Sequence, residues 1–218
     1  MVLRYVVRTS IVLSLGFLLT ACAGGGPPAT SIPVEATTRS IVTVAPGPAE
    51  SPVATLGPIC DGMPTLAQTE GPYYKAGSPE RFSLVEADTV GEVLILTGRV
   101  LTMDCDPVVG AVVDVWQADG VGVYDNDGYR LRGRVRSDGD GVYEIETVVP
   151  GEYPGRTPHI HIKVFGPDGS ERLTTQIYLA GISDQVADSI FSNDLLAIDL
   201  PPGADGTRRI QFEIVLAA

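Results

Sequence analysis

Basic residues are scarce in this sequence of 218 residues, and their scarcity restricts the partners that the chain can bind. Lysine and arginine number 15 against 27 aspartates and glutamates, which gives a formal net charge of −12. Nucleic-acid binding depends on neutralising phosphates with cationic side chains. We therefore expect no nucleic-acid partner, and no electrostatic attraction to anionic lipid.

Long apolar runs are also few, and the run from Ile11 to Thr20 is shorter than the about 20 residues that span a bilayer. Two arginines precede it, so residues 1–21 have the form of an export signal peptide. The sequence Leu19-Thr20-Ala21-Cys22 resembles a bacterial lipobox, which implies cleavage before Cys22 and lipid attachment to its sulfur. We expect an exported, membrane-anchored lipoprotein of the cell envelope that faces outside the cytoplasm. An ordinary secretory signal is the alternative.

Cysteine occurs only three times. With Cys22 lipidated, Cys60 and Cys105 remain in an oxidising compartment, where we expect them to form a disulfide, and two free thiols are the alternative. The bridge would close a loop of about 45 residues and stabilise the fold by on the order of 4 kcal/mol. It would also leave no thiol to act as a metal ligand.

Helical patterns are nearly absent, and the chain divides by composition. Residues 22–58 are rich in Gly, Pro, Ala and Thr and indicate a flexible tether, which leaves residues 59–218 as one folded domain. That domain contains short apolar or alternating runs separated by Asp-, Gly- and Pro-rich turns, which predict an all-β antiparallel β-sandwich. The expected strands are Glu92–Val100, Ala111–Gln117, Leu131–Arg136, Val142–Val148, His159–Phe165, Arg172–Leu179 and Arg208–Leu216. One short helix is expected, from Asp184 to Phe191, after the N-cap residue Ser183.

The whole histidine content of the chain is two residues, His159 and His161, on one expected strand. Alternate strand residues point to the same side and lie about 6.5 Å apart. Both imidazoles therefore face one side, where they can meet a single metal ion. Two tyrosines, Tyr124 and Tyr153, lie in Gly- and Pro-flanked loops and offer phenolate ligands, which suit ferric iron better than zinc. An enzyme that binds a different metal on this strand, such as zinc or copper, is an alternative.

The order and spacing of several short motifs resemble the intradiol ring-cleavage dioxygenase family. The resemblance covers most of the folded region. Its motifs are Glu70-Gly71-Pro72-Tyr73-Tyr74, Val115-Trp116-Gln117-Ala118, Gly122-Val123-Tyr124, Arg132-Gly133, Gly141-Val142-Tyr143, Pro150-Gly151-Glu152-Tyr153-Pro154, His159-Ile160-His161 and Thr175-Gln176.

The resemblance implies a role for each matching position. Tyr124, Tyr153, His159 and His161 would bind one ferric iron, Fe(3+), and Tyr153 would be the ligand that substrate displaces. Arg156 would stabilise negative charge on the substrate ring, Gln176 would lie beside it, and Tyr73 and Tyr74 would line the entrance. The implied reaction cleaves a catechol-type aromatic diol with O2 between its two hydroxylated carbons, giving a muconate-type product.

The sequence departs from the family pattern in its short loops around Tyr124 and Tyr153, which predict an open pocket that accepts bulky or substituted catechols. A different function class remains as the alternative, namely a non-catalytic cell-surface β-sandwich module that binds carbohydrate or protein. Trp116 is expected in the core. The acidic loops at Asp125 and Asp138 are interpreted as turns and not as calcium sites.

Overall fold

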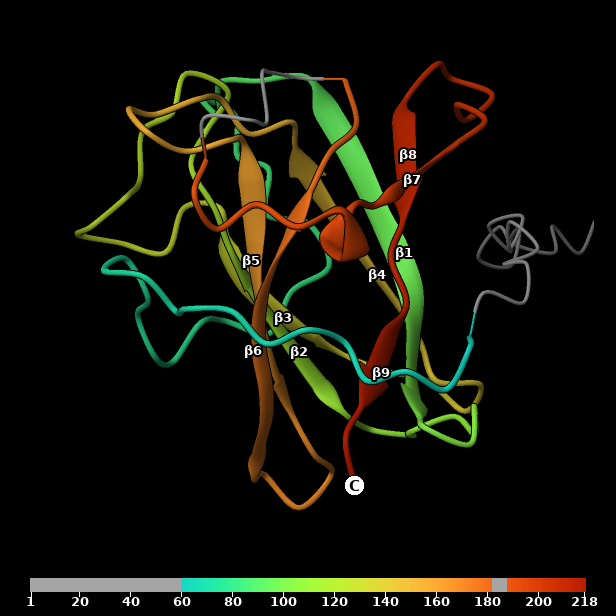
Figure 1. Cartoon of the computed structure of the whole chain (residues 1–218). Helices are drawn as coiled ribbons and strands as arrows, with labels where there is room; N and C mark the ends of the chain where they lie inside the picture. Colours follow the sequence, from blue (N-terminus) through green and yellow to red (C-terminus); the bar gives the residue numbers. More distant parts are fainter. Residues whose placement is uncertain (1–59, 182–187) are drawn as a thin grey trace, which may run out of the picture. The chain divides into compact units, whose positions relative to one another are not determined.

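The computed structural model describes residues 60–181 and 188–218, which belong to one compact unit (Figure 1). The signal peptide and tether expected over residues 1–58 lie outside the described residues. The described chain is almost entirely β-structure in two sheets that pack as a sandwich, so the predicted fold class is confirmed. Within the described ranges, no helix is long and apolar enough to cross a membrane.

The strands of the sandwich form a four-stranded sheet and a five-stranded sheet. The four-stranded sheet has the order β3-β2-β5-β6, and all its pairings are antiparallel. The other sheet has the order β4-β1-β8-β7, and β9 pairs with the far end of β1. The strands are β1 (Val93–Thr102), β2 (Val112–Trp116), β3 (Arg132–Arg136), β4 (Val142–Val148), β5 (His159–Phe165), β6 (Glu171–Tyr178), β7 (Ile198–Leu200), β8 (Arg208–Gln211) and β9 (Ile214–Leu216).

Alternation of side chains along the strands builds the core between the sheets. On β1, Leu94 and Leu96 point inward and are fully buried, and Ile160 and Ile162 do the same on β5. Burial of one such side chain contributes about 1.5–3 kcal/mol relative to its exposure. The strand that carries the histidines is therefore fixed by the apolar residues between them.

The C-terminal region differs from the expectation in three respects. The single strand predicted over Arg208–Leu216 is two strands, because the chain leaves the sheet at Phe212 and Glu213, and both parts pair with β1 in parallel. Strand β7 and the 3-10 helix Asn193–Leu195 were not predicted. Most of the predicted helix Asp184–Phe191 lies outside the described residues, and its described end forms a turn in which the Phe191 N–H donates to the Asp188 carbonyl at 3.1 Å.

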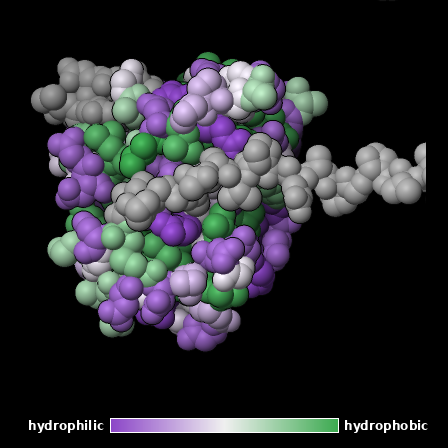
Figure 2. All heavy atoms as spheres, turned by 90° about the vertical axis from the view of Figure 1, so that its right-hand side faces the viewer, coloured by the Kyte–Doolittle hydropathy of each residue, from purple (hydrophilic) through white to green (hydrophobic). Residues whose placement is uncertain are grey.

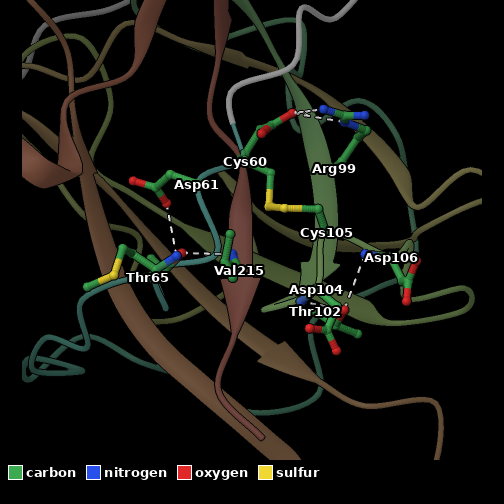
Figure 3. Close-up of a disulfide and its surroundings, with 11 residues drawn as sticks. Cys60, Asp61, Thr65, Arg99, Thr102, Asp104, Cys105, Asp106 and Val215 are labelled. Atoms are coloured by element: carbon green, nitrogen blue, oxygen red, sulfur yellow. Dashed lines mark hydrogen bonds and ion pairs between the residues drawn. A yellow bond between two sulfur atoms is a disulfide. The ribbon is translucent and has the colours of Figure 1, made fainter.

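A disulfide joins Cys60 to Cys105, with a Cα–Cα distance of 5.9 Å, which is compatible with the predicted pairing (Figure 3). Cys105 lies in the turn that follows β1, and Thr102 organises this turn by accepting hydrogen bonds from the Asp104 and Asp106 N–H groups at 3.3 and 3.2 Å. Nearby, Thr65 exchanges hydrogen bonds with Val215 of β9. The start of the described chain is thus attached to the five-stranded sheet.

From there the chain crosses to the outer face of the four-stranded sheet, where it runs over β6 and β5 (Figure 1). The Gln68 N–H donates to the Thr174 carbonyl of β6 at 2.8 Å, and a Cβ on Gly71 would lie 3.3 Å from His161 Cε1. Residues 68–74, the covering segment, thus lie over His161 and over Lys163, whose ammonium donates to Glu70, and both side chains are buried. On another side of the molecule, hydrophilic and hydrophobic residues are interspersed (Figure 2).

Candidate active site

The two histidines of β5 point to the same side of the sheet, as the strand period predicts. They are 2% and 1% exposed, and the Nε2 atoms of His159 and His161 are 3.1 Å apart. Their rings meet edge to face with centroids 4.7 Å apart. The two ring nitrogens therefore converge on one small volume beneath the covering segment.

The protonation of these rings follows from their surroundings. His159 Nδ1 lies 2.6 Å from the Thr157 carbonyl, which can only accept, so Nδ1 carries the proton and Nε2 keeps its lone pair. Burial lowers the pKa of His159 to about 4. Burial, together with the neighbouring His159, lowers the pKa of His161 to about 2. Both imidazoles are neutral at neutral pH, which is the form that binds metals.

Tyr124 reaches this volume from the loop after β2, and two close backbone approaches fix that loop. A Cβ on Gly122 would lie 2.1 Å from the Glu152 carbonyl oxygen, and a Cβ on Gly151 would lie 2.6 Å from the Gly120 carbonyl oxygen. Only glycine fits at such distances. The loop that carries Tyr124 is therefore packed against the segment that leads into Tyr153.

Tyr153 and Arg156 are the two ends of one tight turn. The Arg156 N–H donates to the Tyr153 carbonyl at 3.1 Å, and the residues between them are Pro154 and Gly155. Gly155 has a φ of 81°, so Pro followed by a left-handed Gly matches a type II turn. The Pro-Gly pair therefore places the phenol and the guanidinium on the same side, where Arg156 Nη1 donates to the Tyr153 hydroxyl at 3.4 Å.

The two phenols border the histidines. The ring of Tyr153 lies 5.6 Å from that of His159, the ring of Tyr124 lies 6.3 Å from that of His161, and the two tyrosine rings are 5.8 Å apart. Burial raises the pKa of both hydroxyls, and for Tyr124 the Tyr153 phenol raises it further. The buried Tyr124 hydroxyl has no hydrogen-bond partner among the described residues.

These four groups fit a hard, highly charged cation. They present two neutral imidazoles and two phenols, one of them with an unsatisfied buried oxygen. A nearby multivalent cation lowers the pKa of such a group strongly and converts a phenol into an anionic ligand. The described residues contain no group of three or more His, Cys, Asp or Glu that would hold a metal elsewhere.

Arg156 and Gln176 lie together beside this site. Arg156 Nη2 donates to Gln176 Oε1, while Gln176 Nε2 donates to the Thr69 carbonyl at 2.9 Å. Arg156 Nε donates to Asp188 Oδ2 at 3.0 Å. No sequence pattern pointed to Asp188, because it is 32 residues from Arg156 and follows no motif.

Aromatic rings pack against His161 and Tyr124. Trp116 is buried as predicted, and it stacks on His161 with an interplanar angle of 8° and a centroid distance of 4.7 Å. Tyr73 stacks on Tyr124 at 4.3 Å, whereas Tyr74 packs on Trp116 and turns its hydroxyl toward Asp114. Tyr73 thus borders the site, and Tyr74 lies behind it.

Arg132 is a further residue that sequence reasoning did not assign to the site. Its side chain is fully buried, and it donates to the Asp125 carbonyl at 2.8 Å and to the Tyr73 carbonyl at 2.6 Å. It therefore joins the Tyr124 loop to the covering segment. Its position at the start of β3, in the motif Arg132-Gly133, was the only available signal.

The remaining acidic features have the turn character that was expected. Asp125 Oδ1 accepts from the Asp127 and Gly128 N–H groups, and Asp138 Oδ1 accepts from the Asp140 and Val142 N–H groups. A cavity of about 500 Å³ lies at the start of the described chain, but none of the candidate site residues lines it.

The fold and the site define a class: a β-sandwich protein with two neutral histidines on one strand, two loop tyrosines and an anchored arginine. Comparison with known proteins agrees with this. The profile of a family described as "Dioxygenase" matches residues 69–218. The chain belongs to the intradiol ring-cleavage dioxygenase family.

Two similar proteins show how much of the chain the likeness covers. A 6-chlorohydroxyquinol 1,2-dioxygenase from Cupriavidus pinatubonensis is 33% identical over an alignment of 172 positions, which covers 67% of this chain and 62% of the relative. Catechol 1,2-dioxygenase 2 from Acinetobacter lwoffii is 33% identical over 51% of this chain and 50% of its own length. The chain thus spans about half to two thirds of these curated relatives.

One solved structure is matched by this chain along almost its whole length. It is the dioxygenase domain of a dioxygenase carbohydrate-binding protein fusion from the cellulolytic bacterium Streptomyces sp. SirexAA-E. Its sequence is 41% identical to this chain, the TM-score is 0.67, and the match covers 72% of this chain and 99% of that one.

Proposed function

We propose that this protein is a non-haem ferric iron dioxygenase that uses O2 to open the ring of a catechol-type diol between its two hydroxylated carbons, giving a muconate-type diacid. The observation that carries the proposal is the pair of neutral imidazole nitrogens, 3.1 Å apart, bordered by two buried phenols. Membership of the family supports it.

Tyr124, Tyr153, His159 and His161 are the residues that would hold the iron. When bound, ferric iron would supply Lewis acidity for the two substrate oxygens and the redox chemistry with O2. The protein prepares for this charge by burying phenols that ionise only next to a cation. The Thr157 carbonyl contributes by fixing His159 with its lone pair on Nε2.

The two tyrosines are placed for different tasks. Tyr124 is only 8% exposed and is fixed by its glycine contacts, whereas Tyr153 is partly exposed and lies in the turn beside Arg156. Tyr153 is therefore the ligand that substrate would displace, and its Oη would take up a proton from the substrate. Tyr124 is suited to remain in place.

Arg156 supplies a permanent positive charge next to Tyr153. Gln176 and Asp188 hold the guanidinium from two sides, so its orientation exists before substrate arrives. Preorganised charge of this kind stabilises negative charge as it develops on the reacting ring. Gln176 in turn is oriented by the Thr69 carbonyl.

We further propose that substituted and bulky catechols are substrates. The segments from Tyr124 to Arg132 and from Tyr153 to His159 are short. Val121 and Val123, in the loop that carries Tyr124, are exposed and offer apolar contact. The test compares kcat/KM for catechol and 4-tert-butylcatechol. Values within about tenfold of one another support the proposal, since one apolar group discriminates by about 10–200-fold in a closed pocket. Strict preference for unsubstituted catechol contradicts it.

The function itself is tested by a visible absorption spectrum with iron analysis on the purified protein. One iron per chain and a tyrosinate-to-iron band that shifts when catechol is added under nitrogen are expected. A protein that stays colourless after ferric reconstitution contradicts the proposal and favours the non-catalytic binding module. A colourless protein that holds zinc favours an enzyme with a different metal at the two histidines.

We also propose that the protein is an exported lipoprotein anchored through Cys22, on the basis of residues 1–22 of the sequence. Palmitate labelling in a bacterial host, compared between the natural protein and Cys22→Ala, tests this. Label in the natural protein and its loss in the variant are expected. Equal labelling, or none in either, contradicts the anchor.

A further inference from the structure

Asp188 is a buried carboxylate whose two oxygens are both used. Its side chain is fully buried. Oδ2 accepts from Arg156 Nε and from the Thr157 N–H, each at 3.0 Å, and Oδ1 accepts from the Ile190 N–H at 3.1 Å. A buried carboxylate is stable only when it is paired and hydrogen-bonded in this way. Two of its three partners, Arg156 and Thr157, are adjacent residues beside the site.

Asp188 completes the orientation of the guanidinium. The three nitrogens of Arg156 each have an acceptor: Nε has Asp188, Nη2 has Gln176, and Nη1 has the Tyr153 hydroxyl. The guanidinium is planar, so anchors on two edges fix the direction of the third. The third edge is the one that faces Tyr153.

The Asp188 residue is itself held in place by its surroundings. The turn that it begins is tied to Tyr178, whose hydroxyl donates to the Ile190 carbonyl at 3.3 Å, and to Gln68, whose Nε2 donates to the same carbonyl. Strand β6 and the covering segment thus support the carboxylate from two directions.

We propose that Asp188 is a positioning residue for the ring-cleavage reaction, acting through Arg156. It holds the guanidinium in the direction needed to meet charge on the substrate. The inference rests on the proposed function, because the direction of Arg156 matters only when a catechol binds. Misplacement of such a charge by even 1 Å is enough to slow a reaction by about 100-fold.

Kinetics of the full-length protein provide the first test, with Asp188→Ala and the more conservative Asp188→Asn. We expect kcat per bound iron to fall by about 10–100-fold in Asp188→Ala, and by less in Asp188→Asn, while the tyrosinate-to-iron band remains. Because Asp188→Asn is the more conservative change, it provides the folded variant for comparison if Asp188→Ala does not fold. Asp199→Asn is the matched control, because it alters an Arg–Asp pair with Arg208 that is exposed, and it should leave kcat unchanged.

A merely structural role predicts a different result. In that case iron content and thermal stability fall in Asp188→Ala, but kcat per bound iron does not, and the proposal is overturned. A double-mutant cycle sharpens this: in an Arg156→Ala background, Asp188→Ala should cause no further fall in kcat. If Asp188→Ala lowers kcat in that background by as much as it does when Arg156 is present, Asp188 does not act through Arg156.

A measurement on the metal-free protein separates the proposal from the proposed function. In a 15N spectrum, the Arg156 Nε–H signal, assigned by its loss in Arg156→Lys, should be protected from solvent exchange. It should exchange rapidly in Asp188→Ala, and persistence of protection overturns the positioning role. If protection behaves as expected but no catechol is cleaved, the proposed function fails and the positioning of Arg156 by Asp188 stands.

Discussion

Single residues in this site are tuned by burial more than by neighbouring charge. Desolvation is the main cause of the lowered pKa of both histidines and of the raised pKa of both tyrosines. The protein therefore keeps all four groups neutral until a cation binds. Their burial has a cost in stability, which is clearest for the Tyr124 hydroxyl because it has no partner within the described part of the chain.

Tyr124→Phe should consequently stabilise the metal-free protein while weakening iron binding. Removing an unsatisfied buried hydroxyl recovers up to about 1–3 kcal/mol of unfolding free energy. Chemical denaturation and iron titration measure the two effects. Tyr129→Phe is the matched control, since its hydroxyl donates to the Ala76 carbonyl at 2.9 Å, so stability should fall slightly and iron binding should not change. A Tyr124→Phe protein that binds iron normally contradicts the assignment of Tyr124.

Asp114 provides a pH-dependent prediction outside the site. It is 2% exposed, Oδ1 has no partner within the described ranges, and burial raises its pKa. A carboxyl whose folded pKa is raised stabilises the fold below its unfolded pKa, and that stability is lost as pH rises through the folded pKa. Asp114→Asn should therefore stabilise the protein at pH 7 and lose this advantage near pH 4. Denaturation at both values checks it, and an equal effect at both contradicts it.

At the scale of elements, the positions of the site residues come from one strand and two turns. The histidine pair was predictable because a period of two is a property of any strand, and Ile160 and Ile162 fix which face is inward. The tight turn of Tyr153 and Arg156 was readable from Pro154-Gly155. Tyr124 was a candidate from its loop position, but a loop tyrosine carries no period, and its selection among eight tyrosines came from the resemblance.

Contacts between distant segments were not predictable from local patterns. Asp188 meets Arg156 only through the fold. The break in the last strand has the same origin: Gly98 of β1 approaches the Phe212 backbone so closely that a Cβ would lie 1.8 Å from the Phe212 carbonyl oxygen. The apolar alternation of Arg208–Leu216 contains no sign of this neighbour.

The Pro-Gly turn can be tested by Gly155→Ala. A Cβ there meets nothing within 4 Å, so the substitution acts only through the φ of 81°, a left-handed conformation that costs other residues about 1–2 kcal/mol. Thermal unfolding should show that loss, with a fall in kcat as Arg156 shifts. Gly139→Ala, which also meets nothing within 4 Å and has no positive φ, should have neither effect. Equal behaviour of the two variants contradicts this account.

At the scale of the whole molecule, the disulfide and the covering segment act together. Cys60 fixes the beginning of the described chain next to β1, and the segment that follows covers His161. Removing the bridge frees a loop of about 45 residues, which corresponds to on the order of 4 kcal/mol. The Cys60→Ser and Cys105→Ser double variant should unfold at lower denaturant, and reductant should affect only the natural protein. No response of the natural protein to reductant contradicts the bridge.

The most direct test of the central claim is the product formed from catechol under 18O2 by the iron-loaded protein. Mass spectrometry should show a muconate-type diacid in which both atoms of one O2 molecule are retained, one in each new carboxyl group. A semialdehyde from cleavage beside the diol, or a quinone without added oxygen, would contradict the account.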